Sequence, residues 1–184
     1  ARDYYDVDVT SIQWRIDDED EVQPNIPSAY DTERIPPTDN INDMLVSGEL
    51  DAAMYPKRPS SFIEGTDAIE RLFPDYREEE IRYHQDTGLF PIMHVVVIKD
   101  DVVAEHPWVP MNVRKAFEEA KEVGLSELDH TRKISIVWAK EPLEEQRERV
   151  GWDLWPNNVA DNRAELEAAV SYAAADGLLS EELP

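Results

Sequence analysis

The sequence contains no cysteine, which excludes disulfide bonds, thiolate nucleophiles and zinc–thiolate sites. It also lacks any apolar run that approaches the roughly 20 residues of a membrane-spanning helix, so we expect no membrane insertion. No signal peptide is visible at Ala1. However, the opening residues, ARDYYDVDV, read like the tail of a helix already under way, which makes the missing signal weak evidence.

Basic residues are also few. Twelve Arg and six Lys stand against 41 acidic residues, and the net charge is −23 at pH 7. Such a surface repels nucleic acid and anionic membranes, so we expect neither as a partner. An acidic, lysine-poor surface suits a salt-rich cytosol, where charges are screened within about 3 Å at 1 M salt. An acidic protein from an ordinary cytosol is the alternative.

The most informative segment is the apolar run from Ile92 to Ile98, between Pro91 and the charged residues that follow it. A short run rich in Val and Ile predicts a strand buried on both faces, as in a sheet covered by helices. His94 lies inside this run, where an aliphatic side chain would pack more easily. Because α/β folds place ligands at the ends of such strands, the segment predicts both an α/β fold class and a candidate site.

Other segments carry weaker patterns. Residues 12–16 alternate as in a half-buried strand, and the acids Asp17 to Glu21 predict a solvated loop, with calcium binding as a poorer alternative. Ile134 to Trp138 alternates like a strand but lies between helices. Helices are predicted for residues 38–47 (capped by Thr38 or Asp39, ended by Gly48), 67–73, 75–85, 110–123 (ended by Gly124), 142–150 and 163–176 (capped by Asp161 or Asn162), with a short strand at 50–54.

Five stretches resemble the 4,5-dihydroxyphthalate decarboxylase family, in matching order and spacing, and TGLFPIMHVVVI and HPW are their most specific parts. They are SGELDAAMYPKRP (Ser47–Pro59), RLFPDYREEE (Arg71–Glu80), TGLFPIMHVVVIKDD (Thr87–Asp101), EHPWVPMNVRKAFEEAK (Glu105–Lys121) and GWDLWPNNVADNR (Gly151–Arg163). The resemblance covers nearly the whole chain after about Thr10, but the family is longer, and this chain resembles only its later part.

The resemblance implies an α/β fold of the type 2 periplasmic-binding-protein kind, in which two lobes joined by hinge strands hold a ligand between them. Residues 1–90 would form the remainder of the second lobe. Residues 91–184 would form a hinge strand and a C-terminal helical return to the first lobe. The N-terminal part of this fold, with the opening strands of the first lobe, has no counterpart in the chain.

The candidate substrate-binding residues follow from the needs of an aromatic acid. Lys57 and Arg58 supply local positive charge after the predicted 50–54 strand, and Arg can hold a carboxylate through two hydrogen bonds. A solvated basic loop is the alternative. Tyr55 can offer a hydroxyl, and a face of Trp152 or Trp155 can stack on an aromatic ring, although both tryptophans also suit ordinary core packing.

His84 and His94, on either side of the turn that contains Thr87, are the candidate catalytic residues. Decarboxylating a dihydroxy aromatic acid requires an acid that protonates the ring carbon, and histidine in general exchanges protons near neutral pH. Thr87 is a further candidate for binding substrate. A core histidine bonded to backbone and a cation at a helix C-terminus are the alternatives for His94 and His84. The spacing of these residues matches no familiar metal site, so we expect neither a metal nor another cofactor.

Three functions remain open at this point. The first is a cytoplasmic decarboxylase acting on 4,5-dihydroxyphthalate or a related aromatic acid. The second is an extracytoplasmic solute-binding protein that uses the same cleft without chemistry, and the third is a ligand-sensing or vestigial relative. The enzyme is expected to take a small aromatic carboxylate, and the solute-binding protein, as a component of an ABC-type uptake system, an aromatic or other small organic acid. None of the three predicts an oligomeric state. A shared fold does not separate them, because function depends on the site.

Overall fold

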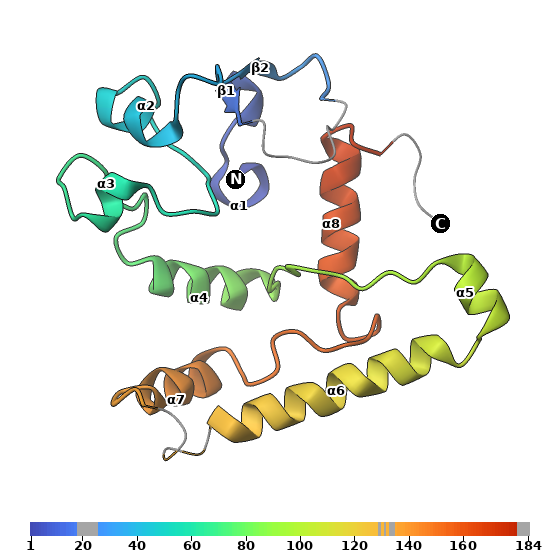
Figure 1. Ribbon diagram of the computed structural model, residues 1–184. Coiled ribbons are helices and arrows are strands. Elements are labelled where there is room, and N and C mark those ends of the chain that lie inside the picture. Colours follow the sequence, from blue (N-terminus) through green and yellow to red (C-terminus); the bar gives the residue numbers. More distant parts are fainter. Residues whose placement is uncertain (18–25, 129, 131, 133–134, 180–184) are drawn as a thin grey trace. The chain divides into compact units, whose positions relative to one another are not determined.

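The computed structural model describes residues 1–17, 26–128, 130, 132 and 135–179. In these residues the chain is mostly helical and has one small parallel sheet (Figure 1). The predicted α/β class is therefore confirmed only in that both helices and a parallel pair of strands are present. The elements in chain order are α1 (Arg2–Tyr5), a 3-10 turn η1 (Val9–Ser11), β1 (Gln13–Ile16), β2 (Asp31–Arg34), α2 (Ile41–Ser47), α3 (Ser60–Ile63), α4 (Tyr76–Thr87), α5 (Asp100–Glu105), α6 (Val109–Leu128), α7 (Lys140–Arg149) and α8 (Arg163–Ala175).

The chain divides into two compact units. Unit 1 comprises Ala1–Tyr76 and Ser171–Pro184, and unit 2 comprises Arg77–Val170. The division at residue 90 that the family resemblance implies concerns the lobes of a longer protein, and it stays a prediction.

Unit 1 contains the sheet. β1 and β2 pair in parallel, with Gln13 opposite Asp31, and β1 confirms the strand predicted from the alternation of residues 12–16. Ile35, which follows β2, and Met44 in α2 are 8% and 3% exposed, and they are the buried apolar residues among those that the structure describes. The apolar core of the described chain is therefore very small for a protein of this length.

Helix α2 begins and ends where the local sequence supplies caps. The side-chain oxygen of Asn40 accepts a hydrogen bond from the Asp43 N–H at 2.9 Å, and the Asn40 amide donates to the Asp43 carboxylate at 2.7 Å. The cap is therefore Asn40, and not Thr38 or Asp39 as predicted. Gly48 ends the helix as predicted, with a left-handed φ of 77° that glycine adopts without a Cβ penalty.

An ion-pair network joins α4 to α7 in unit 2. The guanidinium of Arg149 bonds to both carboxylate oxygens of Glu78, at 2.7 Å for one of them, and lies 3.5 Å from Glu145. Arg77 pairs with Glu145 as well. The hydrogen bond from Arg149 holds the pKa of the Glu78 carboxyl below its ordinary value, because the charged form is the one that accepts it.

Helices α4 and α7 confirm the predicted helices at 75–85 and 142–150, but α6 is longer than expected. Gly124 does not stop α6, which continues to Leu128. A glycine inside a helix lowers helix stability by only about 1 kcal/mol relative to alanine, and the helix-forming residues after Gly124 outweigh that loss.

Two further predicted elements are wrong. Residues 67–73 form no helix, because Pro74 disfavours helical backbone at Phe73 and the segment is too short to be stable without packing. Residues 50–54 form no strand, and Met54 is 91% exposed. The ambiguous Ile134–Trp138 segment forms no strand in its described part, 135–138, and Ile134 lies outside the described residues. Most of the acidic run, residues 18–21, lies outside them too.

The prediction of a buried strand at residues 92–98 is also wrong. Figure 1 draws residues 88–99, between α4 and α5, without a strand. Met93, Val95, Val96 and Val97 are between 63% and 85% exposed, which contradicts burial on both faces. The physical reason is that a strand requires a neighbour for its backbone hydrogen bonds, and no described residue supplies one to this segment.

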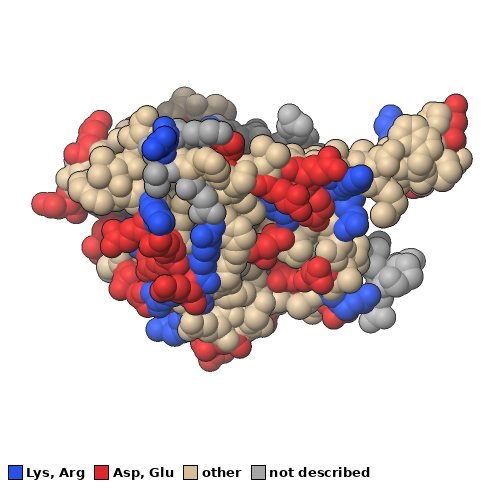
Figure 2. All heavy atoms as spheres, turned by 90° about the horizontal axis from the view of Figure 1, so that it is seen from below, with Lys and Arg blue, Asp and Glu red and all other residues tan. Residues whose placement is uncertain are grey.

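The surface carries both charges in patches. On the face shown in Figure 2, acidic and basic side chains lie beside one another, with broad areas of neither between them. No helix in the described part of the chain combines the length and the apolar character needed to cross a bilayer.

We predict opposite effects for alanine at two glycines. Gly48→Ala forces a side chain into the left-handed region and should destabilise unit 1 by about 1 kcal/mol. Gly124→Ala, inside α6 and facing open space, should stabilise the chain by a similar amount, about 1 kcal/mol. Urea titrations followed by circular dichroism measure both. Equal signs for the two variants would contradict this assignment of helix ends.

We predict that Glu78→Gln lowers thermal stability at neutral pH and has less effect in acid. The folded-state pKa of Glu78 is lowered, so its stabilisation is present above the ordinary pKa of about 4.3 and is lost as the pH falls through the folded value. Melting temperatures of both proteins between pH 7 and pH 3 test this. Glu119→Gln, which removes an exposed pair with Lys115 within α6, is the charge-matched control and should show a smaller difference.

Candidate functional site

A groove of about 820 Å³ lies in unit 2. Its walls come from residues 92–98, the first half of α6, the loop at 155–159 and the first residues of α8. Most of the lining is apolar, and its polar members include His94, Arg114, Asn157 and Asn158. Both the volume and the mixture of an apolar wall with a few polar groups are typical of small-molecule sites, which range over about 300–1,000 Å³.

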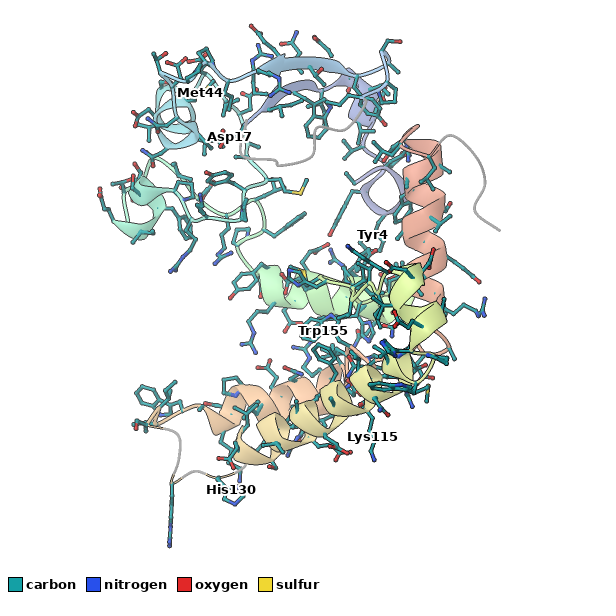
Figure 3. The ribbon with its side chains drawn as sticks, turned by 45° about the vertical axis from the view of Figure 1, so that its right-hand side comes forward. Tyr4, Asp17, Met44, Lys115, His130 and Trp155 are labelled. Atoms are coloured by element: carbon teal, nitrogen blue, oxygen red, sulfur yellow. The ribbon has the colours of Figure 1, made fainter. Side chains whose placement is uncertain are left out.

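Trp155 is fixed in the wall of this groove from several sides. Its indole N–H donates to the Pro91 carbonyl at 3.1 Å, and its ring meets the Phe90 ring edge to face at 5.1 Å. The Lys121 ammonium donates to the Trp155 carbonyl at 3.2 Å and to the Asp153 carboxylate at 2.9 Å. Figure 3 shows Trp155 among the side chains between α4 and α6. The tryptophan therefore couples Phe90 and Pro91, which lead into the 92–98 segment, to α6.

Asparagines stiffen the loop that follows Trp155. Asn162 is 8% exposed, and its amide donates to the carbonyls of Pro156 and Asn158, the latter at 2.7 Å. The Asn158 side-chain oxygen accepts the N–H of Asp161 at 2.9 Å. Asn162, one of the two predicted cap residues, directly precedes α8, and its backbone carbonyl accepts the N–H of Leu166 at 3.0 Å, while its side-chain amide closes the preceding loop. These bonds set the position of the loop as it enters α8.

The two candidate catalytic histidines have different surroundings. His94 lines the groove and is exposed. His84, near the end of α4, is half-buried and packs edge to face against Phe90, with 5.8 Å between ring centroids. Its Nδ1 lies 3.1 Å from the Leu89 carbonyl, and because a carbonyl only accepts, Nδ1 carries the proton in this contact. His84 thus approaches Trp155 through Phe90, whereas His94 and Trp155 share the groove directly.

Thr87 and Trp152 are engaged in local contacts in this structure. The Thr87 hydroxyl donates to the Tyr83 carbonyl at 2.7 Å and accepts the Leu89 N–H at 3.1 Å, so it closes the end of α4. The Arg147 guanidinium lies 3.7 Å from the centre of the Trp152 ring and covers one of its faces. Neither residue lines the groove. Their roles as substrate-binding groups stay predictions.

The remaining predicted residues belong to unit 1. Tyr55 is half-buried, and Lys57 and Arg58 are exposed in an irregular loop rather than at the end of a strand. The groove with His94 and Trp155 lies in unit 2. The candidate residues are therefore divided between the two units, and the ligand roles of the three in unit 1 are untested.

Arg114 lines the groove and was not among the residues predicted from the sequence. The described residues offer it no ion-pair or hydrogen-bond partner. A pattern in the sequence could have revealed it: Arg114 precedes Phe117 by three positions, so the two lie on the same face of α6. An arginine on the apolar face of a helix is a candidate ligand for an anion. Across the described ranges no three His, Asp or Glu side chains come close enough together to hold a metal ion.

No protein-family model matches the chain. The chain is, however, similar to a curated protein, the 4,5-dihydroxyphthalate decarboxylase of Comamonas testosteroni. The two are 29% identical over 190 residues, an alignment that covers 97% of this chain and 57% of the relative. The chain thus spans less than two thirds of the length of the relative. The resemblance seen in the sequence motifs is confirmed: this chain is a distant relative of a 4,5-dihydroxyphthalate decarboxylase and corresponds to little more than half of that protein.

Proposed function

We propose that this chain carries part of the site of a carboxy-lyase that releases carbon dioxide from 4,5-dihydroxyphthalate or a related aromatic dicarboxylate. The observation that carries the proposal is the similarity to the Comamonas testosteroni enzyme over 97% of the chain. This alignment is long enough to include both the 92–98 segment and the Trp155 loop. A groove formed by these two segments gives the proposal a physical location in unit 2.

The proposal includes the fold that the resemblance implies. Two α/β lobes with hinge strands between them, of the type 2 periplasmic-binding-protein kind, would hold the ligand. The parallel pairing of β1 and β2 supports an α/β arrangement, because antiparallel hairpins dominate all-β proteins. Under this proposal residues 92–98 become a hinge strand in the complete fold.

The reaction needs an electron source and a proton. In 4,5-dihydroxyphthalate a hydroxyl lies para to each carboxylate, and its oxygen pushes electrons towards the ring carbon that bears the leaving group. An acid protonates that carbon, the bond to the carboxylate breaks, and the ring becomes aromatic again as carbon dioxide leaves. The net change is one proton taken up and one carbon dioxide released. General acids contribute about 10²–10⁴-fold to such a step.

We assign the acid to His94, which is exposed to the groove. The Trp155 ring, which is 49% exposed, offers a flat face for the aromatic ring of the substrate. Arg114 would hold the second carboxylate, since a guanidinium forms two parallel hydrogen bonds with a carboxylate. In this proposal His84 is a positioning residue. It packs against Phe90, which in turn packs against Trp155.

The proposed partner is a small aromatic carboxylate, with no role for nucleic acid or a membrane. A decarboxylase of this kind would be cytoplasmic. A solute-binding protein that uses the same groove outside the cytoplasm would bind the same ligand and leave it unchanged.

Turnover separates these functions. The protein in its full natural length would be incubated with 4,5-dihydroxyphthalate, and the carbon dioxide released would be compared with the proton uptake. We expect one carbon dioxide per substrate consumed, and one proton taken up when the carbon dioxide is swept out before it hydrates, because bicarbonate formation returns the proton. Tight binding of the dicarboxylate without carbon dioxide, in a folded preparation, would replace the decarboxylase with a binding function.

We predict that Arg114→Gln raises the KM for an aromatic dicarboxylate about tenfold or more, because a charge-assisted hydrogen bond contributes about 1.5–3 kcal/mol. Lys115→Gln is the matched control: Lys115 is next in sequence, is 74% exposed and pairs with Glu119. Arg58→Ala tests the predicted site in unit 1 and should also weaken binding. An unchanged KM for either arginine variant removes that residue from the site.

We predict that His94→Gln lowers kcat by about 10²-fold or more, the range of a lost general acid. KM should change little, since the proton is transferred in the transition state. His130→Gln is the control, because His130 lies at the end of α6, outside the groove, and contacts the Ser126 carbonyl at 2.8 Å (Figure 3). Equal losses in the two variants would show that His94 has no special role.

A further inference from the structure

The groove of unit 2 contains very little charge for a protein of this composition. The chain has 41 acidic residues, yet none of the described residues that line the groove is acidic. Among these lining residues Arg114 alone carries a permanent charge, because a guanidinium does not lose its proton in proteins. The attraction of the groove for an anion is therefore concentrated at one side chain.

The acidic residues that adjoin the groove in sequence already have partners. Each of the three accepts a hydrogen bond that holds the groove wall together. The donors are the Asn158 side-chain amide for Asp161 at 2.8 Å, the Phe90 N–H for Glu165 at 3.3 Å and the Lys121 ammonium for Asp153 at 2.9 Å. Lys121 itself does not line the groove, so it provides no second cation there.

Arg114 lies in the middle of the apolar face that α6 turns to the groove. Pro110 precedes it by four positions and Phe117 follows it by three, and all three residues line the groove. An arginine in such a place can simply lay its stem along the apolar surface and extend its head group into water. The guanidinium is also the group that a carboxylate can bind through two parallel hydrogen bonds.

The surroundings of His94 are different. Decarboxylation protonates the same ring carbon that carries the leaving carboxylate, so this carboxylate must lie beside the acid. The neighbours of His94 in the groove lining, Met93 and Val95, are apolar. A carboxylate is unfavourable in an apolar environment without a partner, whereas carbon dioxide is neutral. An apolar wall at this place therefore favours the step in which the charge is lost.

We propose that Arg114 is the single carboxylate subsite of the groove and that it holds the carboxylate that the substrate keeps. The carboxylate that leaves lies against the apolar wall around His94. The ring carbon takes one proton, its bond to the leaving carboxylate breaks, and the electron pair of that bond returns to the ring as neutral carbon dioxide departs. The reaction step rests on the proposed function, whereas the binding of one carboxylate at Arg114 rests on the groove alone.

The subsite has a consequence for the product. Loss of one carboxylate from 4,5-dihydroxyphthalate gives 3,4-dihydroxybenzoate, which keeps the carboxylate that Arg114 holds. Substrate and product then share their one charged contact with the groove, so the product binds about as tightly as the substrate. The only carboxylate of the product is placed at Arg114, away from the acid, and it is not released.

Binding of unreactive acids tests the subsite. Phthalate, benzoate and benzamide lack the para hydroxyl that the reaction needs, and their Kd values for the protein in its full natural length would be measured by calorimetry. The measurements are made at about pH 8, where histidines in general are mostly neutral. We expect the Kd values of phthalate and benzoate to agree within about fivefold, because each places one carboxylate at Arg114. Benzamide has the shape of benzoate without its charge and should bind about tenfold more weakly or worse.

Two results of this experiment overturn the proposal. Benzoate that binds no better than benzamide shows that the groove has no carboxylate subsite. Phthalate that binds more than about fivefold tighter than benzoate shows that a second group holds the other carboxylate.

Variants assign the subsite to Arg114. Arg114→Met keeps an unbranched apolar stem and removes the charge, so it should weaken phthalate and benzoate alike by about tenfold or more and leave benzamide unchanged. Arg114→Lys should recover part of the loss. Lys115→Met is the matched control, because Lys115 is the next residue of α6 (Figure 3), is 74% exposed and pairs with Glu119. Circular dichroism checks that α6 persists. An equal loss for benzamide, or no loss for benzoate, overturns the assignment.

Turnover separates this proposal from the proposed function. We expect 3,4-dihydroxybenzoate to inhibit the release of carbon dioxide competitively, with a Ki within about fivefold of the KM for 4,5-dihydroxyphthalate. A much weaker Ki overturns the subsite and leaves the decarboxylase in place. No carbon dioxide from 4,5-dihydroxyphthalate, with the expected order of binding among phthalate, benzoate and benzamide, overturns the decarboxylase and supports the subsite.

Discussion

The need of an extended apolar backbone for hydrogen-bonding partners is the constraint on which this structure depends. Helices satisfy their own backbone groups, so α4, α6 and α7 form wherever the sequence allows them. A strand forms its backbone hydrogen bonds with neighbouring strands, and each neighbour can pair at most half of its N–H and C=O groups. Residues 92–98 have the composition of an interior strand but no neighbour, and they remain an exposed connection between α4 and α5. Residues 92–98 also line the open groove of unit 2.

The order that unit 2 does have comes from a few side chains. Trp155 donates to Pro91 and packs on Phe90, while Lys121 holds the same loop to α6. Phe90 is fixed in turn by its backbone N–H, which donates to Glu165 of α8 at 3.3 Å. These contacts position one side of the 92–98 segment although its backbone is unpaired. The groove wall is therefore organised by aromatic and loop contacts, where a sheet would normally do this.

The proposed site depends on this geometry. A groove walled by an exposed segment without a neighbouring strand offers only part of a binding site, because water reaches it along the exposed side. Removing water from around His94 and Arg114 would strengthen their electrostatic interactions with a bound carboxylate.

Local features were predictable from the sequence alone. The end of α2 at Gly48, the start of α6 near Pro110 and the helical span of α7 depend on caps and on residues close in sequence, so a single segment determines them. The resemblance to the decarboxylase family was likewise visible in short motifs. Only the tertiary structure decided the rest: whether residues 92–98 form a strand, which side chains join His94 in a groove, and that Arg114 is one of them. Strand pairing and groove walls need residues far apart in the chain, and no local signal reports whether those residues meet.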